Sequence, residues 1–355
     1  DLRRAVMFLK LLRYSYSSSG KSYACQPFSI CSLFSLIQEV SRRLDNVVIE
    51  NQDFEVLIIE DGSAVRCDEV VKEYEDQLNV RYFFKPNSGR SLTRNYGMER
   101  AEGKYQVFFD SDCIIPEDYF ERVTNYLKET NADCFGGPDR AHASFSLMQK
   151  AISYSMTSFL TTGGIRGSKK GLEKFVPRTF NMGFSLEVYQ KVGGFKDMFG
   201  EDIDLSTRIR KAGFTVELFP EAYVYHKRRV SLKSFYRQVY VFGMARVDLY
   251  QMHPDSLKLV HLLPACFVLG VLFLLLSSLI CPWALLPLGV YILALFLESL
   301  FVNKSLSIAL LSIVTSFIQL GGYGMGFIGA FVRKVILKQK VNVEAELKKH
   351  YKKKA

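Results

Sequence analysis

The stretch Asn87–Tyr119, NSGRSLTRNYGMERAEGKYQVFFDSDCIIPEDY, decides the fold class of this 355-residue chain. Its apolar run Val107–Phe109 predicts a buried strand, because β-branched and aromatic residues suit a sheet that is covered on both faces. Asp110 and Asp112 follow directly. Ligands bind at the carboxyl edge of such a sheet, so paired carboxylates there predict a site for a divalent cation that holds phosphates. An ordinary turn before Pro116 is the alternative from these residues alone.

A helix is expected just before this strand. Residues 91–101 show helical spacing between two chain breaks, Asn87-Ser-Gly89 and Gly103. Arg94 and Asn95 lie on this helix. A guanidinium at that place is positioned for bidentate contact with phosphate oxygens, and a solvated surface arginine is the alternative.

Two further strands precede the helix. Phe54–Ile59 is an apolar run that ends in Glu60-Asp61-Gly62-Ser63, and Val80–Phe84 is the next run. Strands alternating with helices from residue 54 to 135 predict the α/β class with a doubly wound, mostly parallel sheet. Asp61 should therefore reach the same sheet edge as Asp110. An aspartate that caps the turn at Gly62 is an equal alternative.

Several motifs occur in order: N-x-G at 87–89, R-N-x-G at 94–97, A-x-G at 101–103 and F-F-D-S-D at 108–112. Together they resemble the family-2 glycosyltransferases of the GT-A fold, over about residues 54–253. The resemblance implies a metal-dependent, inverting hexosyltransferase. Its donor would be a nucleotide-diphospho-sugar, a UDP- or GDP-sugar, and its cofactor Mg²⁺ or Mn²⁺.

The resemblance also implies roles for individual residues. The residues expected to bind the nucleotide sugar are Asp61, Arg94, Asn95 and Asp110. The expected metal ligands are Asp112, Asp110 and His226. A lone histidine is more often structural, but one at a strand end near an acidic site can be a third ligand.

The stretch Phe199–Leu205 matches the part of the family that carries the catalytic base, which here is Asp202. The reaction needs one carboxylate that takes a proton from the acceptor hydroxyl. Acidic residues at a helix start also simply complement the helix dipole. Glu201 is expected to support geometry or the acceptor, and Asp204 to face away. The expected acceptor-binding residues are Glu201, Asn181, Arg237 and Gln238.

The N-terminal segment departs from the family pattern. Family-2 enzymes normally begin with an apolar strand that ends in Pro-x-Tyr-Asn or a similar turn, and residues 1–50 contain no such motif. Phe28–Cys31 is the best remaining candidate for an incomplete first strand. We therefore expect residues 1–27 to pack poorly and the base pocket around Asp61 to be incomplete.

Membrane segments are expected after the α/β domain. Leu262–Ile280, Trp283–Val302 and Ser305–Val332 each reach the ~20 residues that cross a bilayer. Glu298 within them needs a partner or a protein interior, and the glycines between 321 and 329 predict a small-residue packing face. Basic residues flank the set on both sides, so two or three crossings remain open. The expected division is an atypical segment 1–50, a GT-A domain 51–230, an amphipathic interfacial helix 231–255, membrane segments 262–332 and a basic cytoplasmic tail 333–355.

The charge distribution and the cysteine spacing indicate in which part of the cell the chain is expected. Seven of the ten net positive charges lie from Arg333 onward, which favours a membrane face with anionic lipid over a nucleic-acid surface. The seven cysteines form no C-x-x-C pair, so no zinc site or disulfide framework is expected. We expect a multi-pass inner (plasma) membrane protein with a cytoplasmic catalytic domain and a lipid-linked or polysaccharide acceptor.

Two other functions remain open from the sequence. The missing first strand is compatible with a catalytically impaired membrane scaffold. A metal-dependent nucleotidyl- or phosphotransferase could also use the carboxylates of F-F-D-S-D. That enzyme needs no acid at Asp202, so the Glu-Asp pair argues against it.

Overall fold

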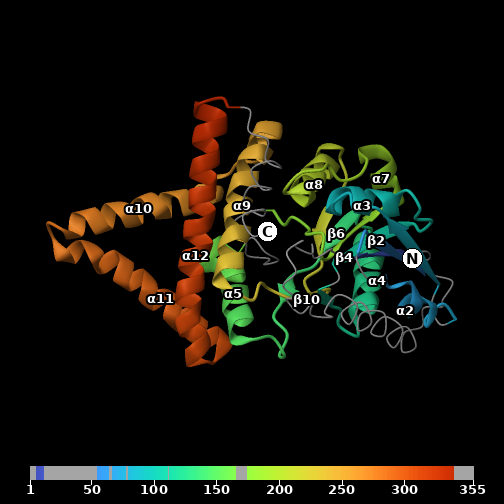
Figure 1. The fold of residues 1–355 in the computed structure, drawn as a ribbon, viewed down its shortest axis with the longest axis horizontal. Coiled ribbons are helices and arrows are strands. Elements are labelled where there is room, and N and C mark those ends of the chain that lie inside the picture. Colours follow the sequence, from blue (N-terminus) through green and yellow to red (C-terminus); the bar gives the residue numbers. More distant parts are fainter. Residues whose placement is uncertain are drawn as a thin grey trace, which may run out of the picture. The chain divides into compact units, whose positions relative to one another are not determined.

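The computed structural model describes residues 5–11, 54–63, 66–76, 79–110, 112–164 and 174–339. These residues form two compact units (Figure 1). The first contains the described residues up to 140 and residues 175–226, and the second contains residues 141–164, 174 and 227–339. The first unit is an α/β domain, and the second is built of helices.

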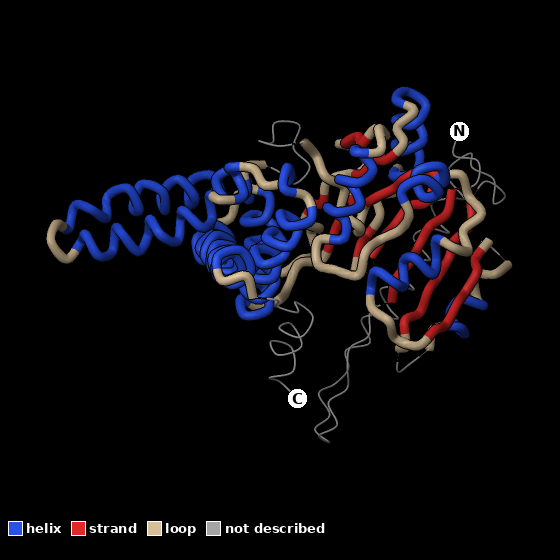
Figure 2. Tube along the Cα trace, turned by 90° about the horizontal axis from the view of Figure 1, so that it is seen from above, coloured by secondary structure: helices blue, strands red, loops and turns tan. Residues whose placement is uncertain are grey.

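The main sheet of the α/β unit has seven strands in the order β3-β2-β1-β4-β8-β6-β9. They are β1 Ala5–Leu11, β2 Phe54–Asp61, β3 Val80–Lys85, β4 Tyr105–Asp110, β6 Cys134–Gly136, β8 Met182–Ser185 and β9 Val216–Leu218. Strand β8 runs antiparallel to β4 and β6, and the other neighbouring pairs are parallel. The strands lie side by side in Figure 2, and the expected mostly parallel sheet is confirmed.

The expectation that residues 1–27 pack poorly was wrong for residues 5–11, and the incomplete base pocket stays a prediction. Strand β1, within the segment expected to pack poorly, pairs in parallel with β2 on one side and β4 on the other. It therefore lies inside the sheet, between β2 and β4, and a strand beside β2 is present. The run AVMFLKL contains Lys10 and ends more than forty residues before β2, so its sequence does not indicate an interior strand. The other candidate, Phe28–Cys31, lies outside the described residues.

Helices cover both faces of the main sheet because its central strands alternate their side chains with period two. Val56 and Ile58 face one core, and Leu57 and Ile59 face the other. The first core is covered by α2 (Asp68–Lys72) and α4 (Tyr119–Thr130). The second is covered by α3 (Arg90–Met98), α7 (Leu186–Val192) and α8 (Glu201–Lys211).

A small second sheet lies in the same unit. Its order is β5-β10-β7, with bounds Cys113–Ile114, Val224–His226 and Asp139–Arg140. Strand β5 follows β4 after a short turn and runs antiparallel to β10. This sheet brings His226 next to the end of β4.

The helical unit contains α5 Leu147–Thr157, α6 Phe159–Thr162, α9 Leu232–Met252, α10 Leu263–Ser278, α11 Leu286–Asn303 and α12 Leu306–Phe331. Short turns of 3-10 helix cover Pro254–Ser256, Leu259–His261 and Pro282–Leu285, and a π-helical turn covers Val332–Ile336. Figure 1 shows α10 and α11 as a long helical hairpin. The helices Leu259–Ser278, Pro282–Asn303 and Leu306–Ile336 are long and apolar enough to cross a membrane, as the three apolar segments indicated.

Helices α9 and α12 pack side by side through glycines (Figure 1). A Cβ atom at Gly243 would lie 2.1 Å from the carbonyl oxygen of Tyr323, and one at Gly326 would lie 2.1 Å from that of Tyr240. Only glycine permits two helix backbones to approach so closely. The expected small-residue packing face of α12 is thus present, and α9 is its partner. The interfacial position of α9 stays a prediction.

The acid within the apolar helices has partners. Glu298 of α11 accepts hydrogen bonds from the hydroxyls of Tyr154 and Ser158, each at 2.6 Å. Both donors are nearly buried. A partly buried carboxylate is costly unless such donors replace water. These two hydrogen bonds tie α11 to α5 and to the start of α6.

Candidate active site

The carboxyl ends of β2 and β4 lie at the same edge of the main sheet, on either side of β1. Glu60 pairs with Leu11, and Asp110 pairs with Lys10, in the parallel register. Asp61 and Asp110 are the last residues of their strands, so the expected meeting of these acids at one sheet edge is confirmed. This edge is where open α/β sheets bind ligands.

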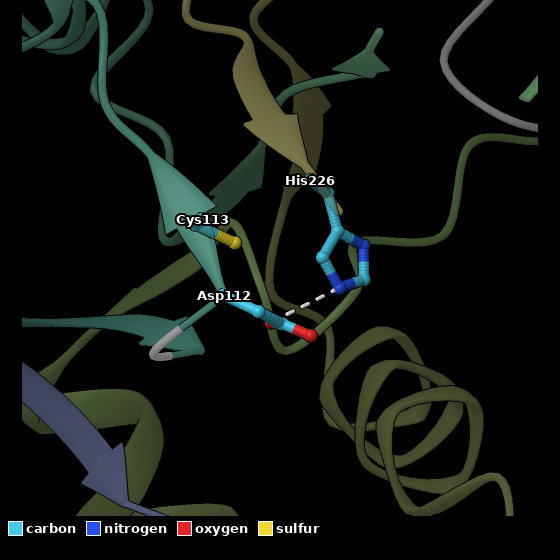
Figure 3. Close-up of side chains that lie close together, drawn as sticks. All are labelled: Asp112, Cys113 and His226. Atoms are coloured by element: carbon cyan, nitrogen blue, oxygen red, sulfur yellow. Dashed lines mark ion pairs between the residues drawn. The ribbon is translucent and has the colours of Figure 1, made fainter. Parts of the chain in front are cut away.

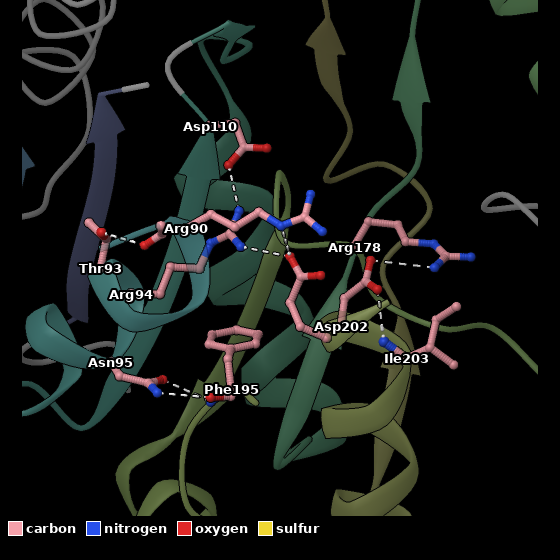
Figure 4. Close-up of polar contacts among 11 residues, drawn as sticks. Arg90, Thr93, Arg94, Asn95, Asp110, Arg178, Phe195, Asp202 and Ile203 are labelled. Atoms are coloured by element: carbon pink, nitrogen blue, oxygen red, sulfur yellow. Dashed lines mark hydrogen bonds and ion pairs between the residues drawn. The ribbon is translucent and has the colours of Figure 1, made fainter. Parts of the chain in front are cut away.

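Arg94 joins the end of β4 to the start of α8 (Figure 4). Its Nη2 donates to Asp110 Oδ1 at 2.9 Å, and its Nη1 donates to Glu201 Oε1 at 3.0 Å. The side chain is 5% exposed. Burial alone would lower the pKa of Arg94, but Asp110 and Glu201 raise it above its ordinary value. Carboxylates hold both ends of the guanidinium in this structure, and the expected phosphate contact stays a prediction.

A second arginine reaches the same carboxylate. Arg90 Nε lies 3.0 Å from Glu201 Oε1, and its guanidinium lies over the ring of Phe199, 4.5 Å from the ring centre. Arg90 was not among the expected site residues. Its spacing of four residues from Arg94 could have indicated it, because residues four apart on a helix share one face. Glu201 is 4% exposed, which favours the expected supporting role over contact with an acceptor.

Asp202 lies in the first turn of α8, beside Glu201 (Figure 4). Its Oδ1 accepts a hydrogen bond from the backbone N–H of Ile203 at 2.8 Å. Its Oδ2 lies 3.4 Å from Arg178 Nη1. The carboxylate is thus held by two donors while its side chain keeps 15% of its surface exposed. Arg178, the first residue of the stretch RTFNMGFS at 178–185, was not among the expected site residues.

The third acid of this turn points elsewhere. Asp204 is fully buried and forms ion pairs with Arg208 at 2.8 Å and Lys196 at 3.1 Å. Helical spacing predicted that Asp204 would face away from Asp202. Its ion pair with Lys196 joins α8 to the preceding loop, and its ion pair with Arg208 lies within α8.

Asp61 organises the loop that begins α3. Its two oxygens accept hydrogen bonds from the backbone N–H groups of Ser88 at 2.9 Å and Gly89 at 3.0 Å, and from the ammonium group of Lys85. The Asn87 side chain also donates to the Asp61 carbonyl at 2.9 Å. Burial alone would raise the pKa of Asp61, but the bonds from Lys85 and Ser88 hold it below its ordinary value of 3.8. The turn-capping role is therefore present, and contact with a nucleotide base stays a prediction.

Two asparagines have structural partners instead of open faces. Asn95 exchanges a pair of 2.8 Å hydrogen bonds with the backbone of Phe195 (Figure 4). Asn181 is fully buried, accepts from the Tyr119 hydroxyl at 2.6 Å and donates to the Ala222 carbonyl at 2.8 Å. In this structure the Asn181 amide is buried and bonded within the protein at its oxygen and its nitrogen, and the expected acceptor contact stays a prediction. Asn95 likewise fixes a loop in this structure.

Asp112 and His226 come together as the metal expectation required (Figure 3). His226 Nε2 lies 3.3 Å from Asp112 Oδ1. The His226 ring also stacks on Phe180, with ring centres 4.5 Å apart. Cys113 completes a group whose ligand atoms all lie within 4.8 Å of one another. The expected ligand Asp110 is held by Arg94, at the end of the same strand.

Arg237 and Gln238 belong to the helical unit. Both lie on α9 and are half-buried. Their expected contact with the acceptor stays a prediction.

Comparison with known proteins shows which family the α/β domain resembles. Residues 34–193 match the model of glycosyl transferase family 2. An uncharacterized glycosyltransferase of Rickettsia felis is 33% identical over 103 residues, which are 29% of this chain and 17% of that protein. The succinoglycan biosynthesis protein ExoA of Rhizobium meliloti is 24% identical over 242 residues, 66% of this chain and 72% of that protein. The minor teichoic acid biosynthesis protein GgaB of Bacillus subtilis is 33% identical over 95 residues, 26% of this chain and 11% of that protein.

Among solved structures, the fold is similar to that of the mannosyltransferase PcManGT from Pyrobaculum calidifontis, solved with GDP-Man and Mn²⁺. The TM-score is 0.50 at 15% identity, with 95% of this chain and 88% of the other covered. The family match, the sheet order and the acids at its edge agree with one another. Residues 34–193 are therefore similar to the glycosyltransferases of family 2, the α/β unit has the GT-A fold, and three apolar helices follow it.

Proposed function

We propose that this protein is a membrane-anchored, inverting glycosyltransferase that moves a sugar from a nucleotide-diphospho-sugar to an envelope glycan or a lipid-linked acceptor. One observation carries the proposal: buried Arg94 ties the end of β4 to the first turn of α8. Asp110 at the strand end is thus joined through Arg94 to Glu201, the residue that precedes Asp202 in the first turn of α8. A donor held at the strand end and a base at the helix start would keep a fixed separation.

The residues after β4 fit a divalent cation. Asp112 and His226 offer a carboxylate and an imidazole 3.3 Å apart, and both are common ligands of such ions. Asp112, with its side chain 42% exposed, is open to a ligand. A bound Mg²⁺ or Mn²⁺ would neutralise the negative charge that develops on the leaving diphosphate.

Asp202 is the proposed general base. Its carboxylate takes the proton of the acceptor hydroxyl while the acceptor oxygen forms a bond to the anomeric carbon. The bond from that carbon to the diphosphate oxygen breaks with its electron pair, and the nucleoside diphosphate leaves. Direct displacement on one face inverts the anomeric centre. Arg178 and the N–H of Ile203 keep the carboxylate in place, so the base needs little reorganisation.

The buried charges around Glu201 have a positioning role. Arg90 and Arg94 share its carboxylate, and Arg94 also holds Asp110. Asp61 positions the loop that begins α3 and so contributes to nucleotide binding through the backbone. We expect the nucleotide sugar to contact the carboxylate oxygens that are exposed at the carboxyl edge of the main sheet.

The relatives and the apolar helices support the proposed acceptor and location. Relatives of this domain take part in succinoglycan and minor teichoic acid biosynthesis, both envelope polymers. The three apolar helices would hold the enzyme at the inner membrane, with its catalytic domain in the cytoplasm, where nucleotide sugars are made. UDP- and GDP-sugars are both candidates for the donor.

The test is a donor screen with a base variant. The full chain, purified in detergent, is incubated with UDP- and GDP-sugars and Mn²⁺, and bound donor and released nucleotide are measured. General-base catalysis contributes about 10²–10⁴-fold, so Asp202→Asn should keep donor affinity and lose turnover by that factor. Asp197→Asn changes an exposed aspartate of the preceding loop and should leave turnover unchanged. Equal turnover in both variants would assign the base elsewhere.

A further inference from the structure

Cys113 and His226 are direct cross-strand neighbours. They are Cα partners in the antiparallel pair of β5 and β10. Residues directly opposite each other in such a pair present their side chains on the same face, with Cβ atoms about 4.5–5.5 Å apart. The backbone register alone therefore places a thiol beside the imidazole.

Asp112 joins this pair from the turn between β4 and β5. Its Oδ1 lies 3.3 Å from His226 Nε2, and one ligand atom from each of the three residues lies within 4.8 Å of the others. Figure 3 shows the Asp112 carboxylate and the Cys113 sulfur on the side where the His226 ring lies. Asp112 comes from the turn before β5, Cys113 from β5 and His226 from β10, more than a hundred residues further along the chain.

This donor set differs from that expected for a hard cation. Mg²⁺ selects oxygen ligands and Mn²⁺ suits carboxylate and water, whereas a mixed set of thiolate, imidazole and carboxylate suits Zn²⁺ and Co²⁺. No zinc site was expected from the sequence because the cysteines form no C-x-x-C pair. In this group only one cysteine contributes, and His226 comes from a distant strand.

We propose that Cys113 is a third metal ligand and that this site prefers a zinc-class ion, Zn²⁺ or Co²⁺, over Mg²⁺. The inference rests on the proposed function in one respect: it concerns the site that the proposed function assigns to the ion of the transfer reaction. On binding, the S–H bond of Cys113 is replaced by a sulfur–metal bond, and the proton leaves to solvent. Three protein ligands leave a fourth position open, which a donor phosphate oxygen can take.

The test uses Co²⁺ as an optical probe of the ligands. The full chain in detergent is titrated with Co²⁺, and we expect a thiolate-to-cobalt charge-transfer band at saturation. Cys113→Ser should remove this band and weaken Zn²⁺ binding by at least about 100-fold, since even changes outside the ligand shell cost about 10–100-fold. Mn²⁺ binding should change much less. Cys266→Ser, at an exposed cysteine of α10, is the matched control and should keep the band.

The outcomes separate the inference from the proposed function. A Co²⁺-saturated wild-type protein without a thiolate band overturns the role of Cys113, whether or not Cys113→Ser folds. If the wild-type protein shows no thiolate band but binds nucleotide sugar with Mn²⁺ through Asp112, the glycosyltransferase proposal stands and the role of Cys113 does not. A thiolate band in a protein that turns over no nucleotide sugar would support the metal site and contradict the transfer reaction. Thermal melting of each variant in the absence of metal confirms that it is folded.

Discussion

Removing the Arg94 guanidinium is the sharpest test of how this site is held together. Arg94 is 5% exposed and makes two charge-assisted hydrogen bonds, at 2.9 Å to Asp110 and 3.0 Å to Glu201. A hydrogen bond to a charged group contributes about 1.5–3 kcal/mol, so the two together contribute about 3–6 kcal/mol. Removing one partner of a buried ion pair costs about 3–5 kcal/mol, because the other charge stays buried. We therefore expect Arg94→Met to lower the free energy of unfolding by about 4 kcal/mol.

The assay is thermal unfolding in detergent, followed by a signal from the α/β unit. For a unit of this size, 1 kcal/mol corresponds to about 2–4 °C, so the expected fall in Tm is about 8–16 °C. Arg90→Met is the matched control, because it removes an arginine from the same carboxylate at a position that is 38% exposed. An exposed pair contributes less than about 1 kcal/mol, so its Tm should fall by only a few degrees.

A double variant tests the physical cause. Glu201→Gln added to Arg94→Met removes the buried negative charge along with the positive one. It should recover part of the lost stability, because Glu201 in Arg94→Met keeps its buried charge with only the partly exposed Arg90 beside it. Equal Tm values for Arg94→Met and Arg90→Met, or no recovery in the double variant, would refute the buried bridge as the element that joins β4 to α8.

Two further predictions concern the sheet edge and the helical unit. The folded state holds the pKa of Asp61 below 3.8, so its carboxylate stabilises the fold above that pH and loses this effect as the pH falls. Asp61→Asn should therefore lower Tm at pH 7 and flatten the acid side of a Tm-against-pH curve, and an unchanged slope would contradict this. Gly326→Ala places a Cβ 2.1 Å from the Tyr240 carbonyl oxygen, so it should cost about 1–3 kcal/mol and loosen α9 from α12. Gly321→Ala, with nothing within 4 Å of the added Cβ, should leave Tm equal or higher, and matching melting curves for the two variants would argue against close packing at Gly326.

Local patterns determined much of this protein from sequence alone. The apolar run before Asp110 and the alternation of strands with helices predicted the sheet and its acidic edge, because side-chain periodicity reports directly on burial. The three apolar helices were predictable for the same reason, since length and hydropathy are local properties. The order of motifs from Asn87 to Asp202 indicated the family.

Tertiary structure decided the points that depend on distant partners. Strand β1 lies inside the sheet only because β2 and β4 pair with it on both sides, and no property of AVMFLKL reveals those neighbours. The Asn181 amide is bonded in the core by Tyr119 and Ala222, which lie far along the chain. A polar residue in a motif looks the same in sequence whether a ligand or a distant backbone group will bind it.

The residues around the end of β4 also divide into those that sequence brings together and those that only the fold brings together. The sequence placed Asp110 and Asp112 together, since they are two residues apart at a strand end. Only the pairing of β5 with β10 brought Cys113 opposite His226, and only the packing of α8 on the sheet brought Glu201 to Arg94. Burial and hydrogen bonding are satisfied between elements far apart in the chain, so the partners of a charged residue are decided by the fold.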